Sequence, residues 1–125
     1  MDKLTFSIKN GAMNGDKART CIQRRDLAGY GFDCGESYVV VENYTYNALE
    51  FRANPDQFER LGNVIDGASD IRKVSCVHDK RRGYTYQTID YRYSKEARVK
   101  LFGNAERLTV TVIDGAIIIR AELAA

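Results

Sequence analysis

The sequence predicts one α+β domain over residues 1–125. Its main part is an antiparallel β-sheet of about seven or eight strands, with one or two short helices packed on one face. Three observations support this class: short alternating segments rich in β-branched residues, turn signals between them, and only one segment with a clear helix start. A hydrophobic fraction of 44% is enough for one core, and no linker or repeat divides the chain.

The carboxyl-terminal segment predicts a hairpin over residues 108–123. The alternating strand Leu108–Ile113 is followed by Asp114 and Gly115, a pair typical of a two-residue type I′ turn in which both residues have positive φ. Such a turn places apolar residues of the two strands opposite one another on one face. The residues expected to be buried there are Leu108, Val110, Val112, Ile117 and Ile119.

One helix is predicted to begin at Pro55. Asn54 can cap it, and proline suits the first helical position. Phe58, Leu61 and Ile65 then recur at helical spacing, which indicates an amphipathic helix packed on the sheet.

The other strands are predicted from alternation and β-branched content. They cover Leu4–Lys9, Tyr38–Glu42, Asn47–Ala53, Ile71–His78, Gly83–Tyr93 and Arg98–Phe102. The segment Asp16–Leu27 is interpreted as a helix with a partly apolar face, although a strand stays open there. Residues 29–35 are interpreted as an irregular loop because glycine recurs in them.

Cys21, Cys34 and Cys76 are expected to be reduced thiols in the cytoplasm, and none is expected to be catalytic. Their number is odd, and the first residues lack the apolar run of a signal peptide. The longest apolar run, 116–119, is too short to cross a bilayer, so no membrane partner is expected.

Charge is distributed unevenly along the chain, although the net charge is only +2. Residues 71–100 carry nine basic and three acidic residues, which gives +6, whereas residues 28–70 carry two basic and eight acidic residues, which gives −6. The acidic region is interpreted as an ordinary surface, with a docking face for a basic protein as the alternative. The basic region is the first feature that bears on partners.

Within the basic region, four of the eight tyrosines lie in ten residues beside a Lys-Arg-Arg triplet. Only one face of a strand here can enter the core, so the other leaves aromatic rings beside cations. Rings and guanidinium groups suit single-stranded nucleic acid, and tyrosine and arginine are also enriched at protein interfaces. An ordinary strand and a solvated turn would also explain them. The predicted binding residues are Lys80, Arg81, Arg82, Tyr84, Tyr86 and Arg92.

The sequence offers little for catalysis, and no catalytic residue, metal or cofactor is predicted. His78 is the only histidine. A Cys76–His78 pair would need close contact along one strand. Cys21, Cys34, Cys76 and His78 are zinc-ligand types without the short paired spacing of structural sites. His78 with Lys80, Arg81 and Tyr84 would suit metal-free RNA cleavage.

The sequence therefore favours a small non-enzymatic binding protein that docks on a protein partner through the surface at residues 72–100. An inhibitor, an immunity-type protein or an accessory protein fits this description. RNA or single-stranded DNA binding by the same surface is the alternative. A small metal-free ribonuclease-like enzyme that uses His78 is the second alternative.

Overall fold

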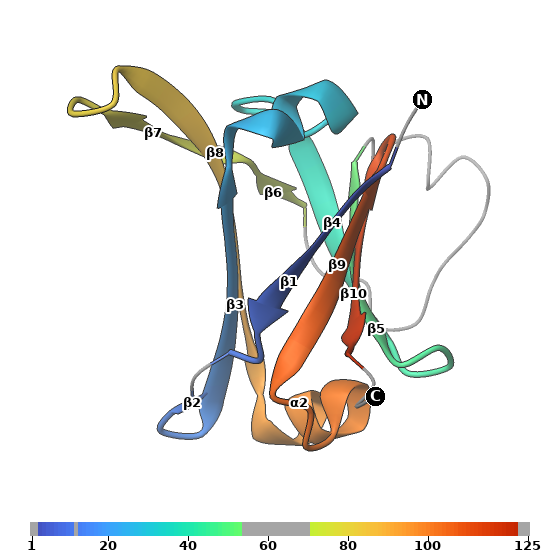
Figure 1. Cartoon of the computed structure of the whole chain (residues 1–125). Coiled ribbons are helices and arrows are strands. Elements are labelled where there is room, and N and C mark those ends of the chain that lie inside the picture. Colours follow the sequence, from blue (N-terminus) through green and yellow to red (C-terminus); the bar gives the residue numbers. More distant parts are fainter. Residues whose placement is uncertain (1–2, 12, 54–70, 123–125) are drawn as a thin grey trace.

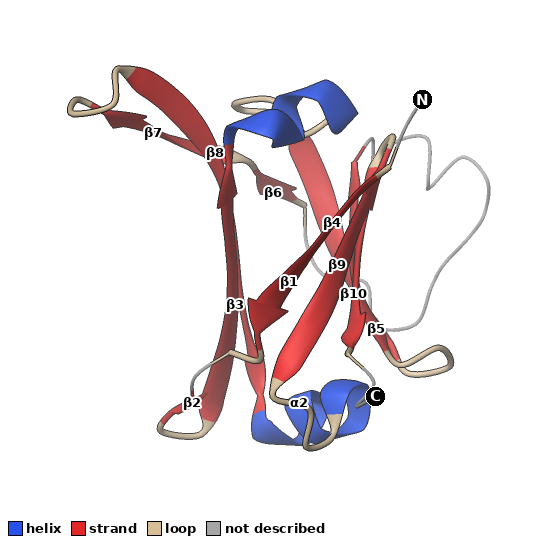
Figure 2. Ribbon diagram, viewed as in Figure 1, coloured by secondary structure: helices blue, strands red, loops and turns tan. Residues whose placement is uncertain are grey.

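The computed structural model describes residues 3–11, 13–53 and 71–122, which form two antiparallel sheets with few helices (Figures 1 and 2). The six-stranded sheet has the order β1 (Leu4–Lys9), β9 (Arg107–Ile113), β10 (Ala116–Ala121), β5 (Ala48–Ala53), β4 (Ser37–Asn43) and β6 (Arg72–Lys73). The four-stranded sheet has the order β2 (Met13–Asn14), β3 (Lys17–Arg24), β8 (Tyr84–Ser94) and β7 (Ser75–Asp79). The predicted mainly antiparallel β-structure with few helices is confirmed. The predicted packing of helices on one face of a sheet is wrong, because two sheets are present and the described helices lie at their ends (Figure 1).

The core lies between the two sheets. Figure 1 shows the 3₁₀ helix η1 (Arg25–Tyr30) over one end of the sheets and the helix α2 (Lys95–Phe102) across the other. Burying an aliphatic or aromatic side chain is worth about 1.5–3 kcal/mol, so this core is the main source of stability. A row of rings at centroid distances of 5.8–6.4 Å runs through it, in the order Phe32, Tyr38, Phe51, Tyr91, Tyr93 and Phe102.

The predicted hairpin is confirmed in position, in register and in burial. Val112 pairs with Ile117, and all five residues expected on the apolar face are fully buried. The predicted type I′ turn is wrong, because only Gly115 has a positive φ (81°) and Asp114 does not. This is the φ pattern of a type II turn. The turn is held from outside, since Gly115 donates its N–H to the Tyr30 carbonyl (2.8 Å) and accepts from the Ala53 N–H (2.9 Å).

The strands predicted at Leu4–Lys9, Tyr38–Glu42, Asn47–Ala53 and Gly83–Tyr93 are confirmed as β1, β4, β5 and β8. The strand predicted at Ile71–His78 is broken at Val74 into β6 and β7, which belong to different sheets. Val74 is buried, its N–H donates to the Glu36 carbonyl, and its carbonyl accepts from the Gly35 N–H. The break therefore marks the point at which the chain passes between sheets.

The helix favoured for Asp16–Leu27 is wrong, because this segment forms β3 and the first turn of η1. Burial alternates along β3, with Ala18, Thr20 and Ile22 facing the core. That period of two belongs to a strand. The loop predicted at residues 29–35 begins inside η1.

The strand predicted at Arg98–Phe102 is also wrong, because these residues lie in α2. The hydroxyl of Ser94 caps the helix by accepting from the Ala97 N–H at 3.1 Å. Ala97 and Leu101, four residues apart, face the core. The helix predicted at Pro55 lies outside the described residues. Within the described part of the chain, no helix is long and apolar enough to cross a membrane.

Candidate functional site

The outer face of the four-stranded sheet carries the predicted aromatic residues. Burial alternates along β8, as predicted for a strand with one face in the core. Tyr84, Tyr86 and Arg92 point away from the core and are half-buried or exposed. The buried residues of the same strand are Gln87, Ile89, Tyr91 and Tyr93.

The Lys-Arg-Arg triplet lies on the turn between β7 and β8. The Asp79 carboxylate shapes this turn by accepting hydrogen bonds from the backbone N–H groups of Arg81 (3.0 Å) and Arg82 (3.2 Å). Gly83 closes it at φ 71°, a conformation that glycine adopts without strain. Lys80, Arg81 and Arg82 are exposed as a consequence.

An open groove of about 540 Å³ joins this hairpin to the start of η1. Three predicted binding residues, Arg82, Tyr84 and Tyr86, line it. We call it the basic-aromatic groove, and its lining is Gln23, Arg24, Arg25, Asp26, Asp79, Arg82, Tyr84 and Tyr86.

The other predicted binding residues are not in the groove lining. Lys80 and Arg81 lie beside it on the turn. Arg92 lies eight residues from Tyr84 along β8, a distance of about 27 Å, and pairs across the sheet with Arg19. The structure therefore gathers half of the predicted residues into the groove and separates Arg92 from them.

Tyr84 is held by two of the groove arginines. The Arg25 guanidinium lies over its ring at 4.6 Å from the centroid, and Arg82 Nη1 donates to its hydroxyl at 3.1 Å. Arg82 also forms an ion pair with Asp79 at 3.8 Å. Arg25 has no carboxylate within ion-pair distance in the part of the chain that the structure describes. Its charge also acts on the neighbouring carboxylate of Asp26 without forming an ion pair with it.

Arg24 is paired on both sides. Its guanidinium donates twice to the Asp26 carboxylate, at 2.9 Å each, and lies 4.2 Å from the ring centroid of Phe6. The hydrogen bonds from Arg24 hold the pKa of Asp26 below its ordinary value. Three arginines and two aspartates give the lining a net charge of +1 (3 − 2).

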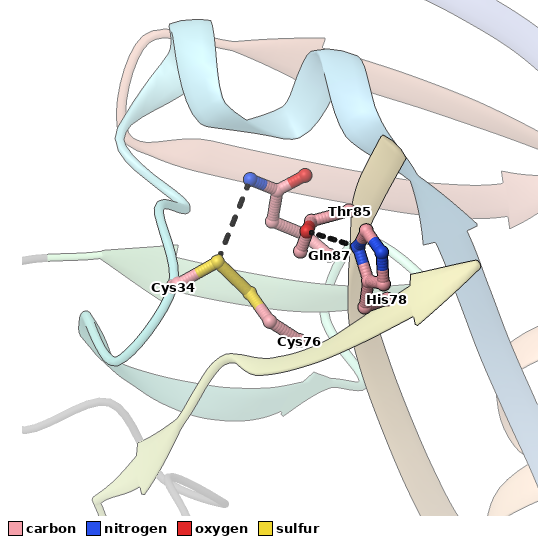
Figure 3. Close-up of a disulfide and its surroundings, with 5 residues drawn as sticks. All are labelled: Cys34, Cys76, His78, Thr85 and Gln87. Carbon is pink, nitrogen blue, oxygen red and sulfur yellow. Dashed lines mark hydrogen bonds between the residues drawn. A yellow bond between two sulfur atoms is a disulfide. The ribbon is translucent and has the colours of Figure 1, made fainter. Parts of the chain in front are cut away.

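The prediction that all cysteines are reduced is wrong, because Cys34 and Cys76 form a disulfide (Figure 3). Their Cα atoms are 5.6 Å apart, within the ordinary range for this bond. Cys76 is exposed on β7 and does not fill the core, and Cys21 stays free. Structural disulfides persist in oxidising compartments, so this bond does not favour the predicted cytoplasmic location.

Gln87 lies between the disulfide and the start of η1. Its buried amide is next to Cys34 Sγ, and Figure 3 draws the amide nitrogen toward that sulfur. With the amide nitrogen turned the other way, it donates to the carbonyls of Arg24 (3.1 Å) and Arg25 (3.0 Å). That orientation satisfies a buried polar group, and we adopt it. The backbone at Arg24 and Arg25 is thereby fixed to β8.

The structure does not place His78 beside the groups that would have to act with it in catalysis. It is exposed, and its Nδ1 lies 3.3 Å from the hydroxyl of Thr85. His78 pairs with Thr85, so it shares the face opposite to that of Tyr84, and the set considered for RNA cleavage is not brought together. Cys76 has no free thiol while the disulfide is formed. Among the described residues, no group of three or more acidic, histidine or cysteine side chains could hold a metal.

Two of the acidic residues of 28–70 are engaged within the fold. Glu50 is buried and paired with Arg52, and Glu42 accepts hydrogen bonds from Tyr44 and Tyr91. Four of the eight acidic residues of 28–70 fall outside the described residues. The docking face considered there gains no support.

Sequence reasoning missed Arg24 and Arg25. Arg24 ends β3 and Arg25 begins η1, within the segment for which a helix is predicted, and a helix there offers no reason to place these residues at the groove. The alternation of Ala18, Thr20 and Ile22 is the signal that would have indicated a strand ending at this point.

Comparison with known proteins assigns no family to this arrangement. A scan against protein-family models, a search of curated proteins and a search of solved structures each found no match. The functional argument therefore rests on the residues of the groove and on their surroundings.

Proposed function

We propose that the chain is a non-enzymatic binding protein that docks on an acidic protein partner through the basic-aromatic groove. An inhibitor, an immunity-type protein or an accessory protein would act in this way. The observation that carries the proposal is the arginine–tyrosine lining around Tyr84, in which Arg25 forms no ion pair among the described residues. Arginine and tyrosine are the side chains that most often dominate binding energy at protein interfaces.

The composition of the groove favours protein over nucleic acid. Asp26 and Asp79 line it together with the arginines, so its net charge is only +1, which is little for binding that depends on neutralising several phosphates. One face of the Tyr84 ring is covered by Arg25, so a base would have to displace that guanidinium in order to stack there. A mixed lining of opposite charges is common at protein interfaces and selects complementary partners.

The enzyme alternative has less support. General base catalysis would need a base within hydrogen-bond reach of a bound substrate. His78 lies on the other face of the hairpin from Tyr84 and Tyr86. The proposed docking function does not depend on the cytoplasmic location predicted from the sequence.

Site-specific photo-crosslinking in a lysate of the source cells tests the proposal. A benzophenone amino acid is placed at Tyr86 in the groove or, as a control, at Val99 on α2, which is 54% exposed and lies at the other end of the molecule. We expect a discrete protein adduct from position 86 only. The adduct should be lost when Arg81→Glu and Arg82→Glu are added, because both residues border the groove and the partner is acidic.

Three outcomes contradict this proposal. Equal adducts from both positions would place the contact elsewhere. An adduct that nuclease treatment removes, together with co-purifying nucleic acid detected by absorbance, would establish the nucleic-acid alternative in its place. An adduct that survives charge reversal with the fold intact would refute the role of the basic turn.

A further inference from the structure

The four-stranded sheet ends in a strand with a free edge. β7 pairs with β8 on one side, and in the sheet order no described strand lies on its other side. Figure 1 shows the β7–β8 hairpin projecting at the upper left, away from β1 and β9. The first four residues of β7 are exposed, and its central residue, Val77, is 42% exposed.

This edge lacks the features that usually protect an edge strand. β7 contains no lysine and no proline, and its register with β8 is continuous from Ser75 to Asp79, without a bulge. Its only carboxylate, Asp79, is engaged in the turn by the N–H groups of Arg81 and Arg82. A regular, unprotected edge with an apolar residue at its centre is a template for another strand.

β7 is also fixed in place before any partner arrives. Cys76 is bonded to Cys34 in the loop after η1. Just before the strand, Val74 exchanges backbone hydrogen bonds of 2.9 and 3.0 Å with Glu36 and Gly35. A strand that is already ordered loses less conformational entropy when it pairs, and this favours binding.

Cations precede and follow β7 in the chain. Two exposed cations of β6 precede it and three exposed cations follow it. Among the described residues, Arg82 is the only one of the five with an ion pair, and the Arg72 guanidinium lies over the Tyr91 ring at 5.1 Å from its centroid. A second copy paired antiparallel through the same edge would bring the two cation groups together, which is unfavourable. An acidic chain would meet cations at both of its ends. The five residues are Arg72, Lys73, Lys80, Arg81 and Arg82.

We infer that β7 takes an extended acidic segment of the partner protein as a fifth strand of this sheet. The inference rests on the proposed function and specifies how the partner is held. Backbone hydrogen bonds to β7 would give the register, and carboxylates at the ends of the segment would reach the flanking cations. Nucleic acid has no peptide backbone to pair with the edge.

The test uses a fluorescent nine-residue peptide with a Val-Thr-Val-Thr-Val centre between two Glu-Glu pairs. A matched peptide is N-methylated at alternate central residues, which removes backbone donors and keeps the charge. We expect the parent peptide to bind and the methylated peptide to bind about tenfold more weakly, because ladder hydrogen bonds are lost. Bound parent peptide should slow amide hydrogen exchange in β7.

Protein variants complete the test. Lys80→Glu with Arg81→Glu should weaken peptide binding, whereas Lys9→Glu with Lys17→Glu, which changes the net charge equally at exposed sites on other strands, should not. No peptide binding, equal binding of both peptides, or protection outside β7 would each overturn strand addition. An adduct from position 86 that persists in those cases would leave the proposed docking function standing, so the two failures are distinguishable.

Discussion

Removal of the Cys34–Cys76 disulfide should destabilise the fold substantially. The two cysteines are separated by 42 residues, and the loop-entropy relation gives a loss of about 4 kcal/mol in the free energy of unfolding. For a domain of this size, such a loss lowers Tm by about 10–20 °C. The double variant Cys34→Ser with Cys76→Ser tests this value by chemical denaturation, and reduced wild-type protein should match the variant.

Cys21→Ser is the matched control, because Cys21 is free and half-buried on the other face of the sheet. Its free energy of unfolding should change by less than about 1 kcal/mol. Thiol titration of the denatured, unreduced protein should detect one thiol of the three cysteines. Detection of three thiols, or equal stability of the double variant and the wild type, would refute the reasoning.

Three further predictions concern stability. Gly11→Ala should lower the free energy of unfolding by about 3 kcal/mol, because the added Cβ would lie 1.7 Å from a backbone carbonyl oxygen of β3. Gly29→Ala is the control: Gly29 has open space around it, so this variant should unfold within about 0.5 kcal/mol of wild type in chemical denaturation. Tyr91→Phe should cost about 1.5–3 kcal/mol, since it removes a buried hydroxyl that donates to Glu42, and the exposed Tyr44→Phe should cost less in the same assay. Burial and, second, the bond to Glu42 raise the pKa of Tyr44 to about 12, and they raise the pKa of Tyr91 as well. The stability that these tyrosines contribute is therefore complete below about pH 10 and is lost as the pH rises further. Circular dichroism and absorbance at 295 nm can follow this loss.

The sequence predicted best the elements whose signals are local and agree with one another. The alternation of Leu108–Ile113 and the Asp114-Gly115 pair indicated a hairpin, and the structure contains that hairpin in the predicted register. The turn type was wrong because hydrogen bonds from η1 and β5 hold Gly115 in a geometry that the dipeptide alone does not select. Tertiary contacts of this kind are invisible in a local pattern.

Both errors of element type came from weak periodicity. In Asp16–Leu27, charged and polar residues on the outer face of β3 obscured the buried alternation. In Arg98–Phe102, apolar residues suggested a strand, although Ser94 and the spacing of Ala97 and Leu101 suited a capped helix. The missed disulfide is of another kind, because pairing across 42 residues depends on topology and not on spacing.

The disulfide also bears on docking, because the hairpin end that carries the groove has little core beneath it. Tyr84 and Tyr86 are only half-buried, and most of β7 is exposed, so burial does little to fix their positions. The end of the hairpin is held in place instead by the Cys34–Cys76 bond, Gln87 and Arg25. Reduction should therefore weaken partner binding at temperatures where the reduced protein is still folded. Without the disulfide, the hairpin would lose conformational entropy when the partner binds, and this loss lowers the affinity. Equal affinity of the folded oxidised and reduced forms would show that the hairpin is fixed without the disulfide.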